Sequence, residues 1–273
     1  MRIGKFAIRK KKLIKYLKHI KRLPNSKYFP STKIKEYWDK NHIFRFYLIL
    51  ESLKTHLSDS SKVLDVGIHP YSLASLLKTE LKCEVIGICK SHDLGDGFEK
   101  DKRYFIKEEF GIQGYLLNVE KDIFPFPDNF FDNVIFTEII EHLLFSPTHT
   151  LYEIHRVLKK DGILIITSPN AISLVKLLKW LKRKNIFDQI SLDDIYGRHN
   201  RDYTKKELEV LLNSCNFKID DIFLFSLPSD CSNFFRKVFY SFSWLKEHIF
   251  IKATPIGKPV KGFPNEIYRH SLS

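Results

Sequence analysis

The sequence predicts an α/β fold in which helices cover both faces of a mostly parallel sheet, and three observations support this. From residue 61 onward, short runs of β-branched and aliphatic residues alternate with segments of helical periodicity. The 273 residues are enough for one large α/β domain or two small ones. Apolar residues make up 44% and charged residues 28% of the chain, and their even spread excludes a disordered or collagen-like protein.

The first 32 residues are expected to be a basic extension of a domain that spans residues 33–273. Residues 1–40 hold 14 Lys and Arg against two acids, which is +12 of the net charge of +13. Within residues 9–23, Leu13, Leu17 and Ile20 share one helical face, which predicts a basic amphipathic helix. Three roles stay open for residues 1–23: packing on the domain, lying on an anionic membrane, or binding RNA phosphates.

The elements that follow predict seven strands and one domain. A second helix is expected over about residues 33–57. Strands are expected at residues 62–66, 84–89, 114–117, 131–136, 163–167, 217–225 and 248–253. Further helices are expected at residues 72–81, 147–158, 205–214 and in the Phe-rich segment 234–244.

Three connections complete this outline. A turn at residues 160–162 is expected to lead into the fifth strand. The last strand follows too closely for a crossover helix, so we expect it to pair antiparallel with the sixth. Residues 168–204 are too many for an ordinary connection, and we expect a lid or substrate-facing insertion there.

The first strand ends in a sequence that suits a small polar ligand. Asp65 and Gly67 stand at a strand-to-helix turn, where a residue without Cβ lets the backbone approach such a ligand closely. The three-glycine fingerprint of dinucleotide sites is missing, so a pyrophosphate cradle is not expected. These residues favour a nucleoside-type ligand, although an ordinary tight turn would carry them too.

Motifs farther along the chain resemble class I S-adenosylmethionine-dependent methyltransferases. They are PFPDNFFDNV at residues 125–134, EHL at 141–143, RVLKKDG at 156–162 and TSPN at 167–170. The sequence GRHNRDYT at residues 197–204 resembles the signature of a subgroup found in surface-polysaccharide pathways. The resemblance covers about residues 35–254 and implies a Rossmann-like fold, a methyltransferase activity and S-adenosylmethionine as cofactor.

The same resemblance implies which residues bind the cofactor. Asp65 and Gly67 would hold its methionine end, and Thr137 would close the site after the fourth strand. Two positions depart from the family pattern, because His69 replaces a glycine and Cys89 replaces the acid that holds the ribose. The positions that correspond to the cofactor site are Asp65, Gly67, His69, Cys89, Asn118, Val119, Glu120 and Thr137.

A second group of residues predicts a metal site. Glu138, Glu141 and His142 are spaced so that one helical turn would aim all three side chains into the cleft. Carboxylates and imidazoles suit Mg²⁺ or Mn²⁺ as well as Zn²⁺. The spacing is similar to that of small-RNA 2′-O-methyltransferases, and this resemblance implies His199, five residues before Thr204, as a fourth ligand. Alternatively, the carboxylates stabilise a helix start, and His142 or His199 acts as general base.

Three functions therefore remain open from the sequence. The first is O-methylation of a sugar hydroxyl in a glycan or glycolipid intermediate, with the basic helix on a membrane surface. The second is metal-dependent methylation of an RNA 2′-hydroxyl, and the third is a catalytically silent binding protein. No transmembrane segment or secretory signal is expected, and the four cysteines lack CxxC spacing. We therefore predict a cytoplasmic protein, with peripheral membrane contact left open.

Overall fold

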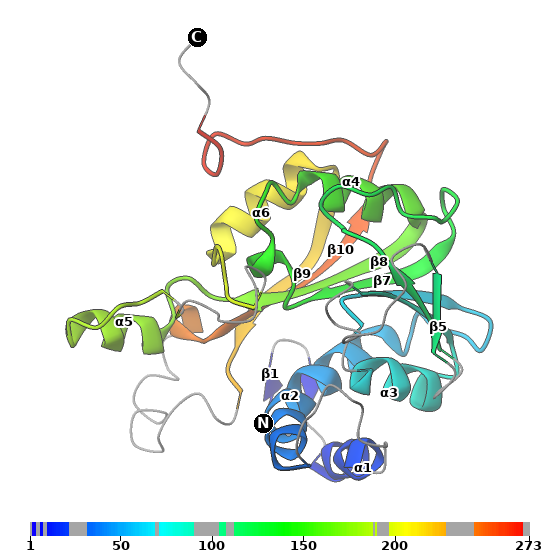
Figure 1. The fold of residues 1–273 in the computed structure, drawn as a ribbon, viewed down its shortest axis with the longest axis horizontal. Helices are drawn as coiled ribbons and strands as arrows, with labels where there is room; N and C mark the ends of the chain where they lie inside the picture. Colours follow the sequence, from blue (N-terminus) through cyan, green and yellow to red (C-terminus); the bar gives the residue numbers. More distant parts are fainter. Residues whose placement is uncertain are drawn as a thin grey trace. The chain divides into compact units, whose positions relative to one another are not determined.

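The computed structural model describes residues 2–3, 6–7, 10–21, 32–68, 71–89, 104–107, 112–187, 189, 197–227 and 243–269 (Figure 1). The chain forms two compact units, one of residues 1–118 with 131–135 and one of residues 119–130 with 136–273. His69 and nearly all of the expected Phe-rich helix lie outside the described residues. No helix among the described residues is long and apolar enough to cross a bilayer.

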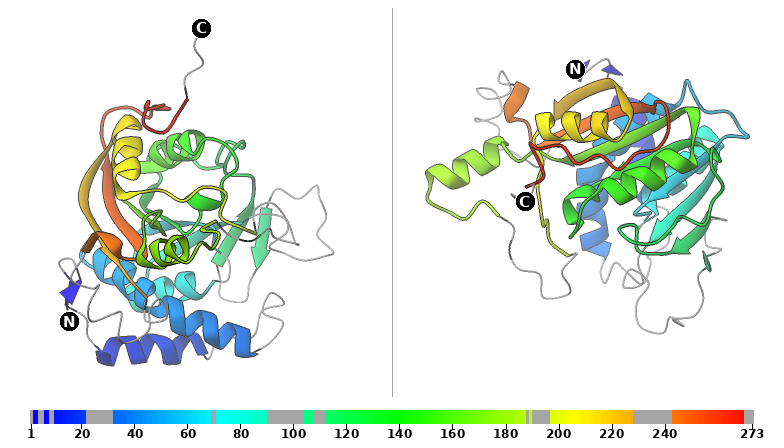
Figure 2. Two further views of the ribbon diagram at one scale, coloured as in Figure 1. Left: turned by 90° about the vertical axis from the view of Figure 1, so that its left-hand side faces the viewer. Right: turned by 90° about the horizontal axis from the view of Figure 1, so that it is seen from above.

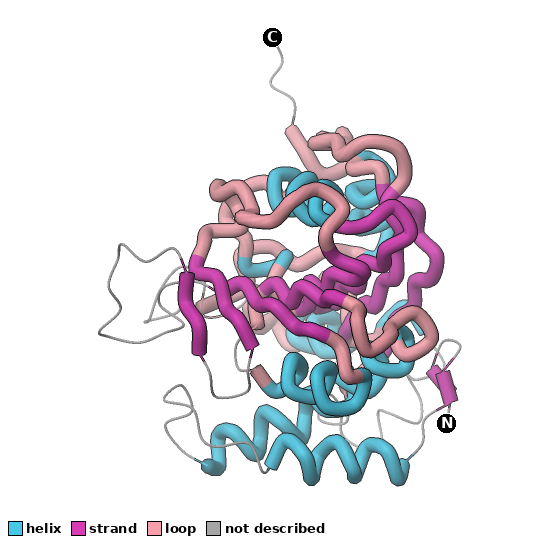
Figure 3. The backbone as a smooth tube through the Cα atoms, turned by 90° about the vertical axis from the view of Figure 1, so that its right-hand side faces the viewer, coloured by secondary structure: helices cyan, strands magenta, loops and turns pink. Residues whose placement is uncertain are grey.

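The first unit contains the parallel part of the sheet. Its strand order is β5-β6-β4-β3, followed by the first five residues of β7. The bounds are β3 Lys62–Val66, β4 Glu84–Cys89, β5 Tyr104–Lys107, β6 Ile112–Leu116 and β7 Phe131–Thr137. β3, β4 and β6 run parallel, whereas β5 pairs antiparallel with β6 at the edge. The strands are drawn in magenta in Figure 3. β5 was not predicted, and it adds an eighth strand to the expected sheet.

Three helices accompany these strands, and a short two-stranded sheet precedes them. They are α1 Lys10–Lys21, α2 Thr32–Leu53 and α3 Ser72–Leu81, after β1 Arg2–Ile3 and β2 Phe6–Ala7. Both α2 and α3 contribute buried apolar side chains, and α1 contacts both of them. Helix α2 corresponds to the helix expected over residues 33–57 and ends four residues earlier than expected, at Leu53.

The basic helix α1 packs on its own unit through charged and aromatic side chains. Tyr16 is only 3% exposed, whereas Leu13 and Leu17 of the predicted apolar face are half-buried. The side chain of Ile20, the third residue of that face, lies outside the described residues. Lys12 binds Glu51 with an N–O distance of 2.6 Å. The corresponding distance from Lys15 to Glu80 is 2.7 Å. Helix α1 thus packs on α2 and α3 of its own unit.

The second unit contains the antiparallel part of the sheet. After the last two residues of β7, the strand order is β8-β10-β9, and β10 pairs antiparallel with both neighbours. The bounds are β8 Leu158–Pro169, β9 Phe217–Phe225 and β10 His248–Pro255. The helices are η3 Ile140–His142, α4 Thr148–Val157, α5 Leu174–Leu181, α6 Lys205–Ser214 and η4 Ser243–Leu245. α6 lies alongside β9 (Figure 2).

These elements confirm the predicted fold class, a mostly parallel sheet whose last strands are antiparallel. One local expectation is wrong: residues 160–162 form part of β8 rather than a turn. β8 is longer than predicted at both ends. At its far end, β10 pairs with it as far as Pro169. At its start, the strand follows directly after α4. The segment 168–204, predicted as an insertion, holds α5 and the loop of residues 197–204.

Candidate functional site

In the first unit, a buried carboxyl and a buried guanidinium interact. Asp65 lies in β3 and is 3% exposed, and Arg45 of α2 is equally inaccessible. Burial raises the pKa of Asp65 to about 7, although the positive charge of Arg45 opposes this rise. A group with this pKa changes its charge near neutral pH.

The turn after β3 has the conformation that its sequence predicts. Gly67 has a φ of 86°, a left-handed conformation that glycine adopts without strain. The backbone N–H groups of Gly67 and Ile68 both donate to the carbonyl of Ile88, at 2.9 and 3.0 Å. This carbonyl therefore anchors the turn to β4, beside Cys89, whose side chain is buried at the strand's end.

The other predicted cofactor residues differ in their surroundings. Asn118 is half-buried and ends the first segment of its unit. In the second unit, Glu120 is buried, and its Oε1 accepts a hydrogen bond of 2.7 Å from the backbone N–H of Phe145. The carbonyl of Val119 accepts a hydrogen bond from Thr150. Thr137 is half-buried at the end of β7.

Three of the four predicted metal ligands lie together in the second unit. Glu141, His142 and His199 each offer one ligand atom, and these atoms lie within 4.8 Å of one another. Glu141 is fully buried. The imidazole rings of His142 and His199 meet edge to face, with centroids 4.9 Å apart. His199 lies beside the other two, as the resemblance implied, although it is distant from them in the sequence.

Both histidines are oriented through their Nδ1 atoms. Nδ1 of His142 lies 3.0 Å from the carbonyl oxygen of Arg198. Nδ1 of His199 lies 3.2 Å from Oδ1 of Asp202. Because both partners are acceptors, Nδ1 carries a proton in each ring, which leaves Nε2 as the nitrogen that could bind a metal. Histidines that bind metals show this arrangement, in which a carbonyl or carboxylate fixes the ring from behind.

Asp202 is a residue that the sequence analysis did not single out. Burial alone would raise the pKa of its carboxyl, but hydrogen bonds from His199 and Lys176 hold that pKa below its ordinary value. Lys176 also forms an ion pair with the carboxylate. A negative charge thus stands behind His199 at neutral pH. The position of Asp202 within the motif at residues 197–204 was the only sequence signal for it.

The loop of residues 197–204 binds the η3 turn directly. The backbone N–H groups of Asn200 and Arg201 donate to the carbonyl of Glu141, at 2.7 and 3.1 Å. The side-chain amide of Asn200 donates to the carbonyl of His142. After the loop, Thr204 caps α6 in a reciprocal pair of hydrogen bonds with Glu207. The motif therefore positions His199 beside Glu141 and His142.

Glu138 does not join the cluster. We expected one helical turn to carry Glu138, Glu141 and His142, but the helix η3 is short and begins only at Ile140. Glu138 has a φ of 54°, which interrupts a right-handed helix before η3. Its carboxylate instead accepts a hydrogen bond of 2.8 Å from Thr167 Oγ1. Thr167 could not be recognised beforehand, because this contact depends on the register of β7 and β8.

The sequence of residues 33–222 matches a family model described as a methyltransferase domain. The chain belongs to the methyltransferase domain family. This match spans more than half of the chain and includes the strands β3 to β8, the cluster and the loop of residues 197–204. The protein is accordingly an S-adenosylmethionine-dependent methyltransferase, as the motifs of the sequence implied.

Solved structures with the same fold come from several organisms. A methyltransferase of Archaeoglobus fulgidus is 20% identical, with a TM-score of 0.51, over 80% of this chain and 99% of that one. One from Thermotoga maritima, described as a possible histamine N-methyltransferase, is 21% identical, with a TM-score of 0.52, over 87% and 99%. These likenesses support the fold of the methyltransferase. A comparison with curated proteins gave no match.

Proposed function

We propose that this methyltransferase transfers the methyl group of S-adenosylmethionine to a sugar hydroxyl of a glycan or glycolipid. The observation that carries the proposal is the cluster of Glu141, His142 and His199. A hydroxyl is a weak nucleophile at neutral pH, so a group that acidifies or deprotonates it is needed. Two oriented imidazoles and a buried carboxylate supply such a group.

The residues of the first unit fit the amino-acid end of the cofactor. This end carries an ammonium and a carboxylate, which are the charges complementary to Asp65 and Arg45. Both side chains are buried, so their charges, when present, are weakly screened and would interact strongly with a ligand beside them. Gly67 adds a turn whose backbone a ligand can approach closely. We assign the methionine end of the cofactor to these three residues.

The cluster residues fit a divalent cation of the Mg²⁺, Mn²⁺ or Zn²⁺ type. Bonds of about 2.0 to 2.2 Å hold such ions to nitrogen and oxygen ligands, so small side-chain rotations would bring the three atoms to one ion. A bound cation would lower the pKa of the acceptor hydroxyl and orient its oxygen. Glu141 and the two histidines would hold it, and Asp202 and the Arg198 carbonyl would keep the imidazoles aimed. Glu138 would act from outside the ligand set.

An RNA 2′-hydroxyl is the competing acceptor, because the cluster would serve any hydroxyl. The spacing of the predicted metal ligands and the basic helix α1 were the reasons to consider RNA, and two lysines of α1 pair with Glu51 and Glu80 of the first unit. These ion pairs offset part of the positive charge of α1, and this smaller charge is our reason to prefer a glycan acceptor. Cys83 and Cys215 are buried thiols, in keeping with a reducing compartment such as the cytoplasm.

The decisive experiment offers both acceptors to the purified protein with methyl-labelled S-adenosylmethionine. Cell-envelope extract and total RNA are incubated separately, and the labelled product is identified by mass spectrometry. We expect label in a sugar of the envelope extract, loss of transfer with EDTA or in His199→Ala, and recovery from EDTA with Mn²⁺. His149→Ala, which changes a histidine outside the cluster, should stay active. Label in RNA alone would overturn the acceptor, and chelator-insensitive transfer by an active His199→Ala would overturn the cation.

A further inference from the structure

Helix α5 exposes an apolar face that its own unit does not cover. Leu174 is its only buried residue. Trp180 and Leu181 are 64% and 62% exposed, and Leu177 precedes them on the same face of the helix. Figure 1 shows that α5 extends away from the strands of its unit. In water, this exposed apolar surface is unfavourable, which indicates a contact with another molecule.

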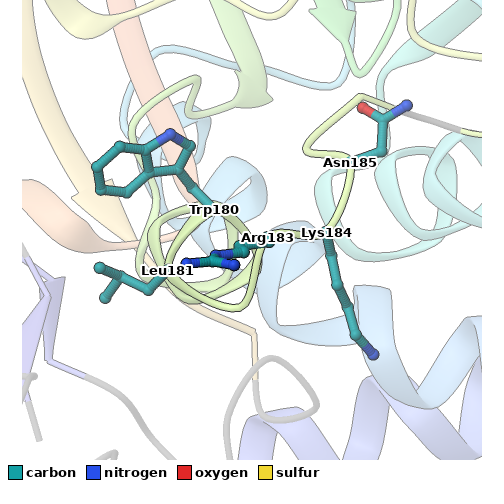
Figure 4. A pocket seen from close by; sticks show the side chains of 5 residues that line it. All are labelled: Trp180, Leu181, Arg183, Lys184 and Asn185. Carbon is teal, nitrogen blue, oxygen red and sulfur yellow. The ribbon is translucent and has the colours of Figure 1, made fainter.

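The other face of α5 and the residues after it are strongly basic. Residues 172–187 contain five cations and no acid, and all five cations lie between Lys176 and Lys184. Figure 4 shows Arg183 beside Leu181, and Lys184 pointing away from the apolar side chains of both Trp180 and Leu181. Together with Asn185, these side chains line an open hollow of about 600 Å³. The apolar face is therefore bordered by positive charge.

We propose that α5 is a membrane-docking helix that lies on the surface of an anionic phospholipid bilayer. Its apolar side chains would enter the boundary between headgroups and acyl chains, while Lys179, Lys182 and Arg183 meet lipid phosphates. Tryptophan favours this interfacial depth because its ring is amphipathic. A second copy of the same face would bring like charges together, so charge complementarity favours an anionic lipid surface over self-association.

The base of α5 is firmly connected to the catalytic cluster of its unit. Ser173 caps the helix by accepting a hydrogen bond from the backbone N–H of Lys176. The side chain of Lys176 pairs with Asp202, which also binds His199. A membrane that holds α5 would therefore hold an element linked to His199. This consequence rests on the proposed function, because it would suit a lipid-linked sugar acceptor, whereas the membrane contact itself does not depend on that function.

The test measures sedimentation of the full-length protein with vesicles, in the absence of cofactor and acceptor. Vesicles of phosphatidylcholine are compared with vesicles that also contain phosphatidylglycerol. We expect binding only with the anionic lipid, and a loss of about tenfold or more in the Trp180→Ser/Leu181→Ser variant. The control is Ile123→Ser/Phe263→Ser, which removes two exposed apolar residues elsewhere and should bind normally.

A charge test separates the lipid phosphates from apolar binding. Lys182→Glu/Arg183→Glu should abolish binding, whereas Lys160→Glu/Lys258→Glu makes the same change in net charge at other exposed sites and should leave most of it. Full binding by the Trp180→Ser/Leu181→Ser variant would overturn the proposal and would point to another surface. If the wild type is a dimer in solution and the Trp180→Ser/Leu181→Ser variant is a monomer, the membrane proposal is overturned in favour of self-association. Because no methyl transfer is measured, a failure of the proposed function would not alter these results.

Discussion

The imidazoles of His142 and His199 meet edge to face, and each ring is held from behind through Nδ1 by an oxygen acceptor. One histidine comes from the turn after β7, and the other comes from the loop before α6. Backbone hydrogen bonds from Asn200 and Arg201 to the Glu141 carbonyl fix these two segments to each other. The backbone therefore fixes the two segments that carry the histidines, and the Nδ1 contacts orient the rings.

Asp202 should act as a positioning residue for His199. We expect Asp202→Ala to weaken the binding of Mn²⁺ or Zn²⁺ about 10- to 100-fold, because His199 loses the carboxylate that fixes its ring and tautomer. Isothermal titration with the metal alone measures this effect. Lys176→Ala is the matched control, since it breaks the other contact of Asp202 and leaves the His199 contact in place. Equal losses in the two variants would show that Asp202 only stabilises the fold.

Thr167 should matter for stability and not for metal binding. Its hydroxyl donates to Glu138 at 2.8 Å, and Thr167 itself is buried. Thr167→Val removes this donor while keeping the shape of the side chain, so we expect the free energy of unfolding to fall by about 1 to 3 kcal/mol. Chemical denaturation gives this value, and titration with Mn²⁺ should be unchanged. A lost metal affinity would mean that Glu138 belongs to the ligand set.

Asp65 should make the stability of the protein depend on pH between its ordinary pKa of 3.8 and its folded-state pKa of about 7. Its pKa is about 7 in the folded protein and 3.8 in its ordinary state. Between these values the folded protein holds a proton that the unfolded chain has lost, so stability falls as the pH rises. Relative to Asp65→Asn, the wild type should lose up to about 1.4 kcal/mol per pH unit in this window. Urea denaturation at pH 5, 6 and 7 measures the difference.

The same carboxyl should govern binding of the cofactor. Only the ionised form of Asp65 attracts the ammonium group of S-adenosylmethionine, so affinity should rise as the pH increases through about 7. Isothermal titration at pH 6 and pH 8 would show this rise in the wild type. In Asp65→Asn the affinity should be lower and nearly independent of pH. A pH-dependent affinity that survives in Asp65→Asn would assign the effect to another group.

Tyr16 should anchor α1 to the first unit. Its side chain is 3% exposed, its ring lies 6.2 Å from that of Tyr47, and burial raises its pKa to about 12. We expect Tyr16→Ala to lower the free energy of unfolding by about 2 to 4 kcal/mol, because a buried aromatic side chain is lost. Ile14→Ala removes a residue that is 46% exposed and should change it by less than about 0.5 kcal/mol. Thermal or chemical denaturation compares the two variants, and a loss in Ile14→Ala as large as that in Tyr16→Ala would contradict this role.

Much of the fold could be predicted from local patterns. The bounds of β3, α3, β4, α6 and β9 agree with the sequence, because hydrophobic periodicity and capping residues act over a few neighbouring positions. The full length of β8 and the presence of β5 could not be predicted from local patterns. Residues 160–162 resemble a turn locally but continue a strand, and β5 has its pairing partner only in β6. Strand pairing depends on distant segments, and a local pattern does not contain that information.

The sequence by itself indicated the family and the fold class through the resemblance of its motifs. It related Glu141 to His142 by their spacing, and the resemblance added His199 to them. Only the tertiary structure separated Glu138 from this group and added Asp202 behind His199. Side-chain partners are chosen by the path of the backbone, and a left-handed residue at position 138 and a loop that binds the Glu141 carbonyl set that path here. The tertiary structure also showed that α1 is packed and α5 exposed, since burial depends on what lies opposite each helix.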